Sequence, residues 1–321
     1  MAVIKGDTPL HSACRESDLT RVRRLIEEGE DADILAQNSA GETPLHVACA
    51  KGSADVVACF LRSSHANNNI NLDLNVRSMR HKTPLHYACS RGKEDVMQRL
   101  LQFGGATDGI SINVNVQDGE GYAPLHYACQ TGRKQMVKCL LESVRMNDDI
   151  RINVNIQTRY GLTPLHCACE DDSADVVNCL LEESYIDDSI DLDINMPDIF
   201  GRTPLHIACE NTSAAAVECL LHFCCTHDNT NIDLDIKNGD GYTPLHCACF
   251  HGNTEAVDCL LGHSDLGDKG SRKIGLHIPD TDEGFTPLAV AIDEDLDDLV
   301  EDLLRSTYMR TIGSGVPSEY S

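Results

Sequence analysis

The apolar positions of this chain fall into paired stripes that recur about every 40 residues. The first stripe of a pair follows a proline, as in residues 44–49, and the second begins about ten residues later, as in 56–61. Each stripe has the spacing of a short helix with one apolar face. A glycine such as Gly52 or Gly92 often separates the two. We therefore predict helix–turn–helix units, each too small to bury its own core and buried by stacking on its neighbours.

A single motif, Thr-Pro-Leu-His-x-Ala-Cys, opens each pair of stripes. Threonine is a good residue for the N-cap of a helix, and proline at the first helical position loses no hydrogen bond. A motif that returns at a nearly fixed spacing is typical of a stacked array of small units. Copies begin at Thr8, Thr43, Thr83, Ala123, Thr163, Thr203, Thr243 and Thr286.

Before most copies of the motif, apolar and polar residues alternate. This pattern with a period of two predicts a strand with one buried face. The segments are 112–116, 152–156, 190–194 and 232–236.

In these features the chain resembles the ankyrin-repeat family, from about Lys5 to Met309. The resemblance rests on the motif, on the Val-x-x-Leu-Leu of the second helix, and on lead-in residues such as those from Asn115 to Gly121. It implies an all-α dominated repeat solenoid of stacked helix–turn–helix repeats with β-hairpin arms. Ankyrin units usually have about 33 residues, so we expect the extra residues to give extended β-hairpin arms and longer loops.

The resemblance also sets the expected domain organisation and the role of the motif histidine. We expect a single ankyrin-repeat domain of eight repeats over residues 1–310 and a flexible tail over 311–321. The histidine is expected to brace neighbouring loops, and Ala289 replaces it in the last copy, where no following unit remains. Acidic residues of that last unit, such as Asp297 and Asp298, are expected to form a polar outer face.

Composition narrows the class of protein. Tryptophan is absent and aromatic residues make up 4% of the chain, so the core should consist of Leu, Val, Ile, Ala and Cys. No apolar run approaches the roughly 20 residues of a membrane helix, and the N-terminal residues lack the apolar centre of a signal peptide. These features predict an intracellular, cytoplasmic protein with no membrane insertion.

The 16 cysteines follow the repeat. Most occupy the last position of the motif, as Cys89 does, or the second helix, as Cys139 does. Free cysteine at core positions acts as a small apolar residue, so we expect reduced thiols in a reducing compartment. Cys224 and Cys225 lie outside the pattern and are expected to be the most exposed.

The net charge of −25 is confined to the second half of the chain. Residues 1–160 hold 19 Lys and Arg against 19 Asp and Glu, whereas residues 161–321 hold 7 against 32. This balance disfavours nucleic acid, whose phosphates require a basic face. It favours a partner with a basic segment, although the acids could serve only to keep the chain soluble.

Sites of catalysis or metal binding are not expected. His166 and Cys169 have ligand spacing, but these residue types recur every 40 residues instead of converging on one point as zinc requires. Asp191 and Asp193 lack the glycine turn and terminal glutamate of a calcium loop. No nucleophile elbow, phosphate loop or metalloprotease motif occurs. We therefore expect a protein that is not an enzyme and has no cofactor.

The resemblance implies that hairpin tips and the ends of first helices line a concave groove that binds a partner protein. Aromatic residues and arginine at these positions are typical of binding hot spots. Two alternatives stay open: an architectural spacer or self-associating scaffold, and the recognition domain of a microbial effector or symbiont protein. The candidate groove residues are Arg80, Tyr122, Arg159, Tyr160, Leu162, Phe200, Arg202, Tyr242, Glu170, Asp171 and Glu210.

Overall fold

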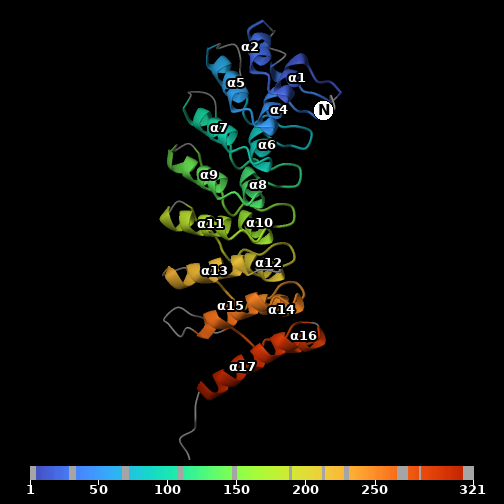
Figure 1. The fold of residues 1–321 in the computed structure, drawn as a ribbon, viewed down its shortest axis with the longest axis vertical. Coiled ribbons are helices and arrows are strands. Elements are labelled where there is room, and N and C mark those ends of the chain that lie inside the picture. Colours follow the sequence, from blue (N-terminus) through green and yellow to red (C-terminus); the bar gives the residue numbers. More distant parts are fainter. Residues whose placement is uncertain are drawn as a thin grey trace, which may run out of the picture. The chain divides into compact units, whose positions relative to one another are not determined.

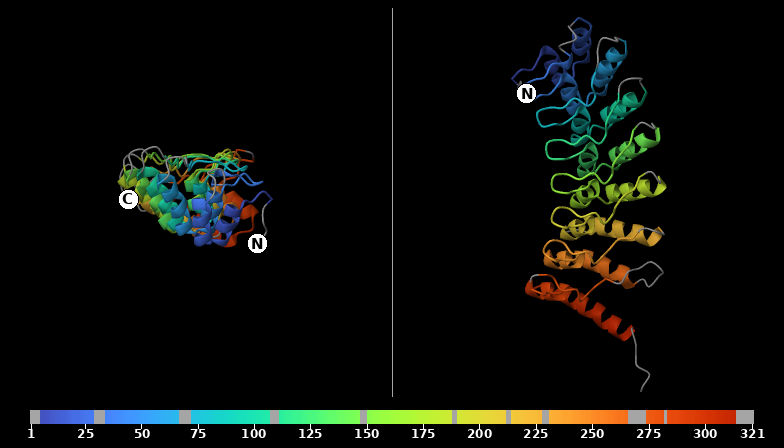
Figure 2. Two further views of the ribbon diagram at one scale, coloured as in Figure 1. Left: turned by 90° about the horizontal axis from the view of Figure 1, so that it is seen from above. Right: turned by 180° about the vertical axis from the view of Figure 1, so that it is seen from behind.

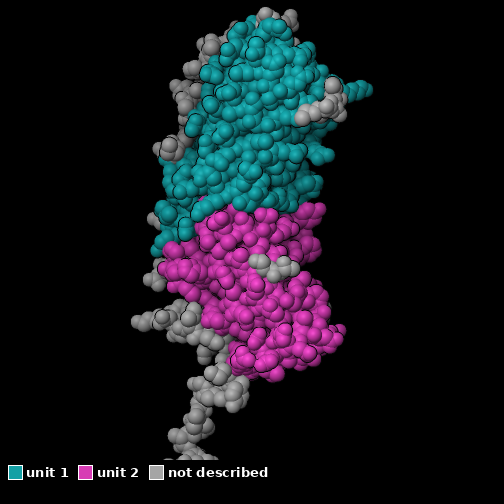
Figure 3. All heavy atoms as spheres, viewed as in Figure 1, with its two compact units in different colours: residues 1–159, 182–191 teal, residues 160–181, 192–321 magenta. Residues whose placement is uncertain are grey.

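The computed structural model describes residues 5–28, 34–66, 72–106, 111–146, 150–187, 190–211, 214–227, 231–265, 274–281 and 283–313. It divides into two compact units (Figure 3). Unit 1 comprises residues 1–159 and 182–191, and unit 2 comprises residues 160–181 and 192–321. Within the described ranges no helix is both long and apolar enough to cross a membrane.

Unit 1 is a double row of helices (Figure 1). The first helices of the repeats pack side by side, and each second helix packs against the first helix of its repeat or against the next second helix. Figure 2 gives the same rows from above and from behind. The first helices are α1 (Pro9–Glu16), α4 (Pro44–Lys51), α6 (Pro84–Ser90) and α8 (Pro124–Gln130), and the second are α2 (Leu19–Glu28), α5 (Ala54–Ala66), α7 (Glu94–Ala106) and α9 (Lys134–Met146).

Unit 2 repeats this arrangement (Figure 1). Its first helices are α10 (Pro164–Glu170), α12 (Pro204–Glu210), α14 (Pro244–Phe250) and α16 (Pro287–Asp293), and its second helices are α13 (Ala215–Thr226), α15 (Thr254–Asp265) and α17 (Asp297–Gly313). Helix α11 (Ala174–Ile186) has residues 174–181 in unit 2 and 182–186 in unit 1. Helix α17 continues past residue 310, and residues 314–321 of the expected tail lie outside the described ranges.

Each first helix begins at the proline of the motif, as predicted. The preceding threonine has extended backbone angles, for example φ −89° and ψ 166° at Thr83. The role of its hydroxyl differs from the expectation, however. The hydroxyls of Thr163 and Thr83 both lie 2.8 Å from Nδ1 of the motif histidine. The Thr163 hydroxyl also accepts a hydrogen bond from the His166 N–H at 3.3 Å, whereas Thr83 makes no such cap hydrogen bond. The histidine ring thus replaces the helix backbone as the partner of the hydroxyl in several repeats.

The core consists of the residue types that composition predicted. In the repeat that contains α6 and α7, Leu85, Cys89, Val96 and Leu100 are at most 1% exposed. All 16 cysteines fall within the described ranges, and 12 of them are buried. Burial raises the pKa of the Cys89 thiol well above its ordinary value. The Cys89 thiol therefore stays protonated and packs as an apolar core group.

The extended β-hairpin arms predicted from the alternating segments are not confirmed: the described residues contain no strand. The alternation of burial is nevertheless present, since Ile112, Val114 and Val116 are buried while Asn113 is exposed. Of the loops expected before these segments, 147–149 lies outside the described ranges, and 104–109 does so in part, because residues 104–106 belong to α7.

Asparagine side chains join these segments in place of a strand ladder. The Oδ1 atom of Asn115 accepts a hydrogen bond from the Asn153 N–H at 2.8 Å, and its amide donates to the Arg151 carbonyl. Asn75 likewise accepts from the Asn113 N–H at 2.7 Å and donates to the Ser111 carbonyl at 2.9 Å. We call Asn75, Asn115, Asn155 and Asn195 the asparagine ladder; the last two donate to the carbonyls of Asp191 and Asn231. One amide thus serves two backbone groups of the following repeat, so the segments need no continuous pairing.

Candidate protein-binding surface

The turns that precede the motif are shaped by one polar side chain each. In Asp118, Oδ1 accepts hydrogen bonds from the N–H groups of Glu120 and Tyr122 at 2.9 and 3.0 Å. A short side chain that binds backbone N–H groups two and four residues later stabilises a tight turn. Asn38, Asp198 and Asn238 do the same in their repeats. We call residues 38–42, 78–82, 118–122, 158–162, 198–202, 238–242 and 280–285 the tip turns.

Neighbouring tip turns are tied by backbone hydrogen bonds. In unit 1 the Gly119 N–H donates to the Arg80 carbonyl at 2.9 Å. In unit 2 the Ile199 N–H donates to the Tyr160 carbonyl at 3.1 Å. Gly121 has φ +86°, and a Cβ atom there would lie 2.7 Å from the Arg159 nitrogen, so only glycine fits this approach.

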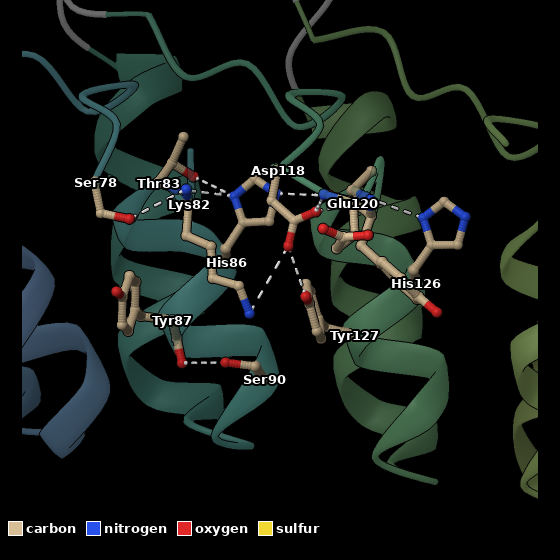
Figure 4. Close-up of polar contacts among 12 residues, drawn as sticks. Ser78, Lys82, Thr83, His86, Tyr87, Ser90, Asp118, Glu120, His126 and Tyr127 are labelled. Carbon is tan, nitrogen blue, oxygen red and sulfur yellow. Dashed lines mark hydrogen bonds and ion pairs between the residues drawn. The ribbon is translucent and has the colours of Figure 1, made fainter. Parts of the chain in front are cut away.

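The motif histidines of α1, α4, α6, α10, α12 and α14 link their helices to the next tip turn, as the resemblance implied. The His86 ring accepts a hydrogen bond at Nδ1 from the Thr83 N–H at 3.0 Å (Figure 4), and its Nε2 donates to the Tyr122 carbonyl at 3.0 Å. A carbonyl can only accept, so Nε2 carries a proton; Nδ1 accepts a hydrogen bond and carries none, so the ring is neutral. Burial lowers the pKa of His86, and likewise of His46 and His206, to about 4. The rings therefore hold the turns in a fixed position.

In unit 1, several polar groups at the tip turns are satisfied by one another (Figure 4). The Tyr127 hydroxyl donates to Oδ2 of Asp118 at 2.7 Å. The Lys82 ammonium lies 3.8 Å from the same oxygen and 4.3 Å from the centre of the Tyr127 ring. Burial lowers the pKa of Lys82, although the charge of Asp118 opposes that shift. These side chains stabilise the turn by contacting one another, so they are not free to bind a ligand.

The candidate groove residues of unit 1 differ in how they are presented. Arg80 and Arg159 are exposed, and the Arg159 guanidinium lies 3.8 Å from the Glu120 carboxylate. Tyr122 is half-buried, with its ring centre 5.5 Å from that of His126 and 5.4 Å from that of Tyr127. Tyr122 therefore packs against α8, whereas the two arginines face solvent.

Unit 2 contains a cavity of about 750 Å³ between its tip turns and its first helices. The aromatic side chains that line it are Phe200, Tyr242, Phe250 and Phe285, and the carboxylates are Glu210, Asp240, Asp280, Glu283, Asp293 and Glu294. Phe200 is 56% exposed and Phe250 is 46% exposed. The cavity thus combines accessible rings with a carboxylate rim, and we call it the aromatic–acidic cavity.

Of the candidate residues, Phe200, Arg202, Glu210 and Tyr242 meet at this cavity. Arg202 is held internally, because its guanidinium contacts the Asp198 carboxylate at 2.8 Å and that of Glu210 at 3.1 Å. Four other candidates lie in unit 2 but not on the cavity lining: Tyr160, Leu162, Glu170 and Asp171. Tyr160 is 50% exposed, Leu162 is half-buried, and Glu170 and Asp171 are exposed at the end of α10.

The sequence analysis did not assign the acids of the last repeat to this site. Asp293 and Glu294 belong to a repeat that was interpreted as a polar end face, yet both line the cavity. They follow the start of their motif copy at the distance at which Phe250 and His251 follow theirs. Extending the repeat register through the last copy would have identified them.

The carboxylates of the cavity are in different electrostatic states. Burial acts to raise the pKa of Asp280, but N–H groups of Gly284, Glu283 and Phe285 donate to its carboxylate, and the net shift is downward. Burial raises the pKa of Glu210, although Arg202 opposes the shift. Asp240, Glu283, Asp293 and Glu294 are exposed and remain available to a cation. No group of three or more His, Cys, Asp or Glu suited to a metal ion is found among the described residues.

Comparisons with known proteins agree with this architecture. The crystal structure of the ankyrin repeat domain of Bcl-3, a member of the IkappaB protein family, is similar in fold, with a TM-score of 0.60 and 23% identity over 80% of this chain and 99% of that chain. No curated protein sequence matches the chain. A family model that describes three successive ankyrin repeats matches the chain in four ranges, which are residues 2–72, 65–153, 150–232 and 223–311. Ankyrin repeats imply a scaffold for protein–protein interaction. With matches along nearly its whole length, the chain belongs to the ankyrin-repeat family.

Proposed function

We propose that this chain is a non-enzymatic scaffold that binds a partner protein through its tip turns and first helices. The proposal further states that unit 2 takes a basic segment of that partner into the aromatic–acidic cavity. The single observation that carries the proposal is the cavity of about 750 Å³, in which exposed aromatic rings and exposed carboxylates face the same space.

The exposed rings support a binding role. Only 4% of this chain is aromatic, yet Phe200 and Phe250 leave about half of their surface in water. Leaving large apolar side chains exposed loses the stabilisation that their burial would give the fold. Buried aromatic anchors dominate many protein interfaces. A partner that covers these rings would recover that stabilisation.

The charge of the cavity selects the chemistry of the partner. Asp240, Glu283 and the acids that end α16 are exposed and uncompensated by a cationic lining residue, since Arg202 already pairs with Asp198 and Glu210. The Arg202 guanidinium also lies 5.4 Å from the centre of the Phe200 ring. That contact indicates that the rings suit a cation on their faces. Arginine fits best, because it stacks on rings and pairs with carboxylates through two parallel hydrogen bonds.

A second candidate is self-association. It is favoured by the exposed Arg80 and Arg159 on the tip turns of unit 1, which could supply the cations from another copy of the chain. A spacer with no groove ligand would leave the exposed rings of unit 2 without a role. The two binding candidates predict different segments in the cavity. The first predicts a segment of another protein, and the second predicts a tip turn from another copy of this chain.

The test compares three labelled peptides that differ only in having arginine, lysine or glutamate at the same positions. We expect the arginine peptide to bind at least about tenfold more tightly than the glutamate peptide, which corresponds to about 1.4 kcal/mol. A Phe200→Ala, Phe250→Ala variant should lose at least about tenfold in affinity. Fluorescence anisotropy gives the affinities.

The matched control is Tyr185→Ala, which removes an exposed aromatic ring that does not line the cavity. It should leave the affinity unchanged, and all variants should melt at the temperature of the parent. Equal affinity for the arginine and glutamate peptides, or equal losses in both variants, would refute the assignment of the cavity.

A further inference from the structure

A second cavity of unit 2, of about 530 Å³, lies on the second helices, away from the residues that line the aromatic–acidic cavity. It is formed by α11, α13 and α15. Its lining includes Leu221 and the thiols of Cys219, Cys225 and Cys259. Three thiols at one cavity are not explained by protein binding through the tip turns.

One of these thiols is placed differently from every other cysteine of the chain. All 16 cysteines lie in the described ranges, and Cys225 is the one that is exposed. Its Sγ atom, on α13, lies 3.2 Å from Nδ1 of His263 on α15. His263 is 8% exposed and lines the same cavity. An accessible thiol thus touches a ring nitrogen from a neighbouring helix, at the edge of a space large enough for a small molecule.

We propose that Cys225 is a reactive thiol that is modified covalently by a small α,β-unsaturated carbonyl compound, with His263 as its general base. Nδ1 of His263 takes the proton from the thiol as sulfur attacks the β-carbon. The S–C bond forms and the C=C π bond breaks, and its electrons move toward the carbonyl. The proton then passes to the α-carbon, so the addition is complete without an oxidant or a second reactant. The mainly apolar wall that includes Leu221 holds the body of the electrophile.

The protonation states suit this step. Burial lowers the pKa of His263, so the ring is neutral at pH 7 and Nδ1 can accept a proton. The other titratable groups at the cavity are Glu218, His222, Cys219 and Cys259, while α11 contributes the neutral Asn178.

The two neighbouring thiols are poorer nucleophiles, because the thiolate is the reactive form. Burial raises the pKa of Cys219. Burial, and then the charge of Glu218, raise the pKa of Cys259 to about 11. The remaining member of the adjacent pair, Cys224, is only half-exposed. The cavity therefore directs an electrophile to Cys225.

The experiment treats the native full chain briefly with N-ethylmaleimide and locates adducts by peptide mass spectrometry. We expect the first adduct on Cys225. A His263→Asn variant should react at that position at least about tenfold more slowly. The matched control Cys224→Ser should react as the parent does. Adducts that accumulate equally on Cys139, Cys224, Cys225 and Cys259, or an unchanged rate in His263→Asn, would overturn the proposal.

The pH dependence of the Cys225 modification rate in the unaltered chain tests the role of His263 even if the His263→Asn variant fails to fold. An unassisted thiol with an ordinary pKa near 8.5 gains about tenfold in rate per pH unit between pH 6 and pH 8. Assisted by His263, Cys225 should show a clearly shallower rise, and the variant should regain the tenfold slope. The ordinary slope in the unchanged chain would show that the histidine does not act as a base.

Discussion

At the residue scale, the motif histidine fixes the first helix of a repeat to the tip turn that follows it. Its ring joins three parts of the chain: the N-cap, the first helix and the next tip turn. For His206 these contacts are the Thr203 N–H at Nδ1, at 3.1 Å, and the Tyr242 carbonyl at Nε2, at 3.0 Å. The contact at Nδ1 requires the neutral ring, because protonation there would remove the acceptor that the threonine N–H uses. The stability of the array is therefore linked to pH through these rings.

The free energy of unfolding should fall as the pH is lowered from about 6.5 to about 4. The pKa of His46, His86 and His206 is about 4 in the folded chain, against an ordinary value of 6.5. Above pH 6.5 both states are neutral and the stabilisation is complete. Below it the unfolded chain binds protons that the folded chain does not, which costs about 1.4 kcal/mol per pH unit for each ring. Urea unfolding between pH 7.5 and pH 4.5 measures the slope.

The control is His86→Asn, which removes one such ring. The titration of the many carboxylates is common to both proteins, so the difference in slope isolates the histidine. The variant should be less stable at pH 7 but should lose stability less steeply, by about 1.4 kcal/mol per pH unit near pH 5. Parallel curves would show that this ring titrates alike in the folded and unfolded chains.

At the scale of elements, the alternating segments show what a periodic pattern can and cannot establish. In residues 112–116 the sequence correctly predicted which side chains are buried, because burial there follows the period of two. It did not predict how the backbone is paired, because that depends on side chains in a different repeat. The asparagine ladder supplies those contacts with amides such as Asn115, which lies 36 and 38 residues before its two partners. A local pattern in the sequence does not reveal a contact between residues that lie so far apart along the chain.

Replacing Asn115 with alanine should lower the free energy of unfolding by about 1 to 2 kcal/mol, because two hydrogen bonds between repeats are lost. Urea unfolding monitored by circular dichroism gives the change. The matched control is Asn113→Ala, which removes the acceptor of one local hydrogen bond, from the Asn115 N–H at 2.9 Å. It should cost about half as much. A loss in the control as large as that in Asn115→Ala would contradict a special role for the ladder.

At the scale of the whole molecule, the repeat allowed the sequence to predict the family, the helix pairs and the core. The candidate groove residues remain a prediction, and the structure presents them differently from one another. Phe200 and Tyr242 do line the aromatic–acidic cavity, but Tyr122 packs against α8 and Arg202 is held by Asp198 and Glu210. Position in the repeat indicates which side a residue occupies, whereas its freedom to bind depends on which neighbour already contacts it.

The charge asymmetry also has a structural counterpart. The second half of the sequence carries the whole net charge of −25, and the aromatic–acidic cavity lies among its residues. Solubility alone would be served by acids spread over any exposed face. Their coincidence with exposed rings at one cavity is the reason for assigning them a partner.

The most direct test of the central claim is photo-crosslinking in cells, with a photoreactive phenylalanine analogue at position 250 and, as the control, at position 185. The crosslinked peptide is then sequenced by mass spectrometry. Our account predicts a crosslink from Phe250, absent from Tyr185, to an arginine-rich or lysine-rich segment of another protein. Equal crosslinking at both positions, or a segment without basic residues, would contradict it. A crosslink to a second copy of this chain would replace the partner protein with self-association.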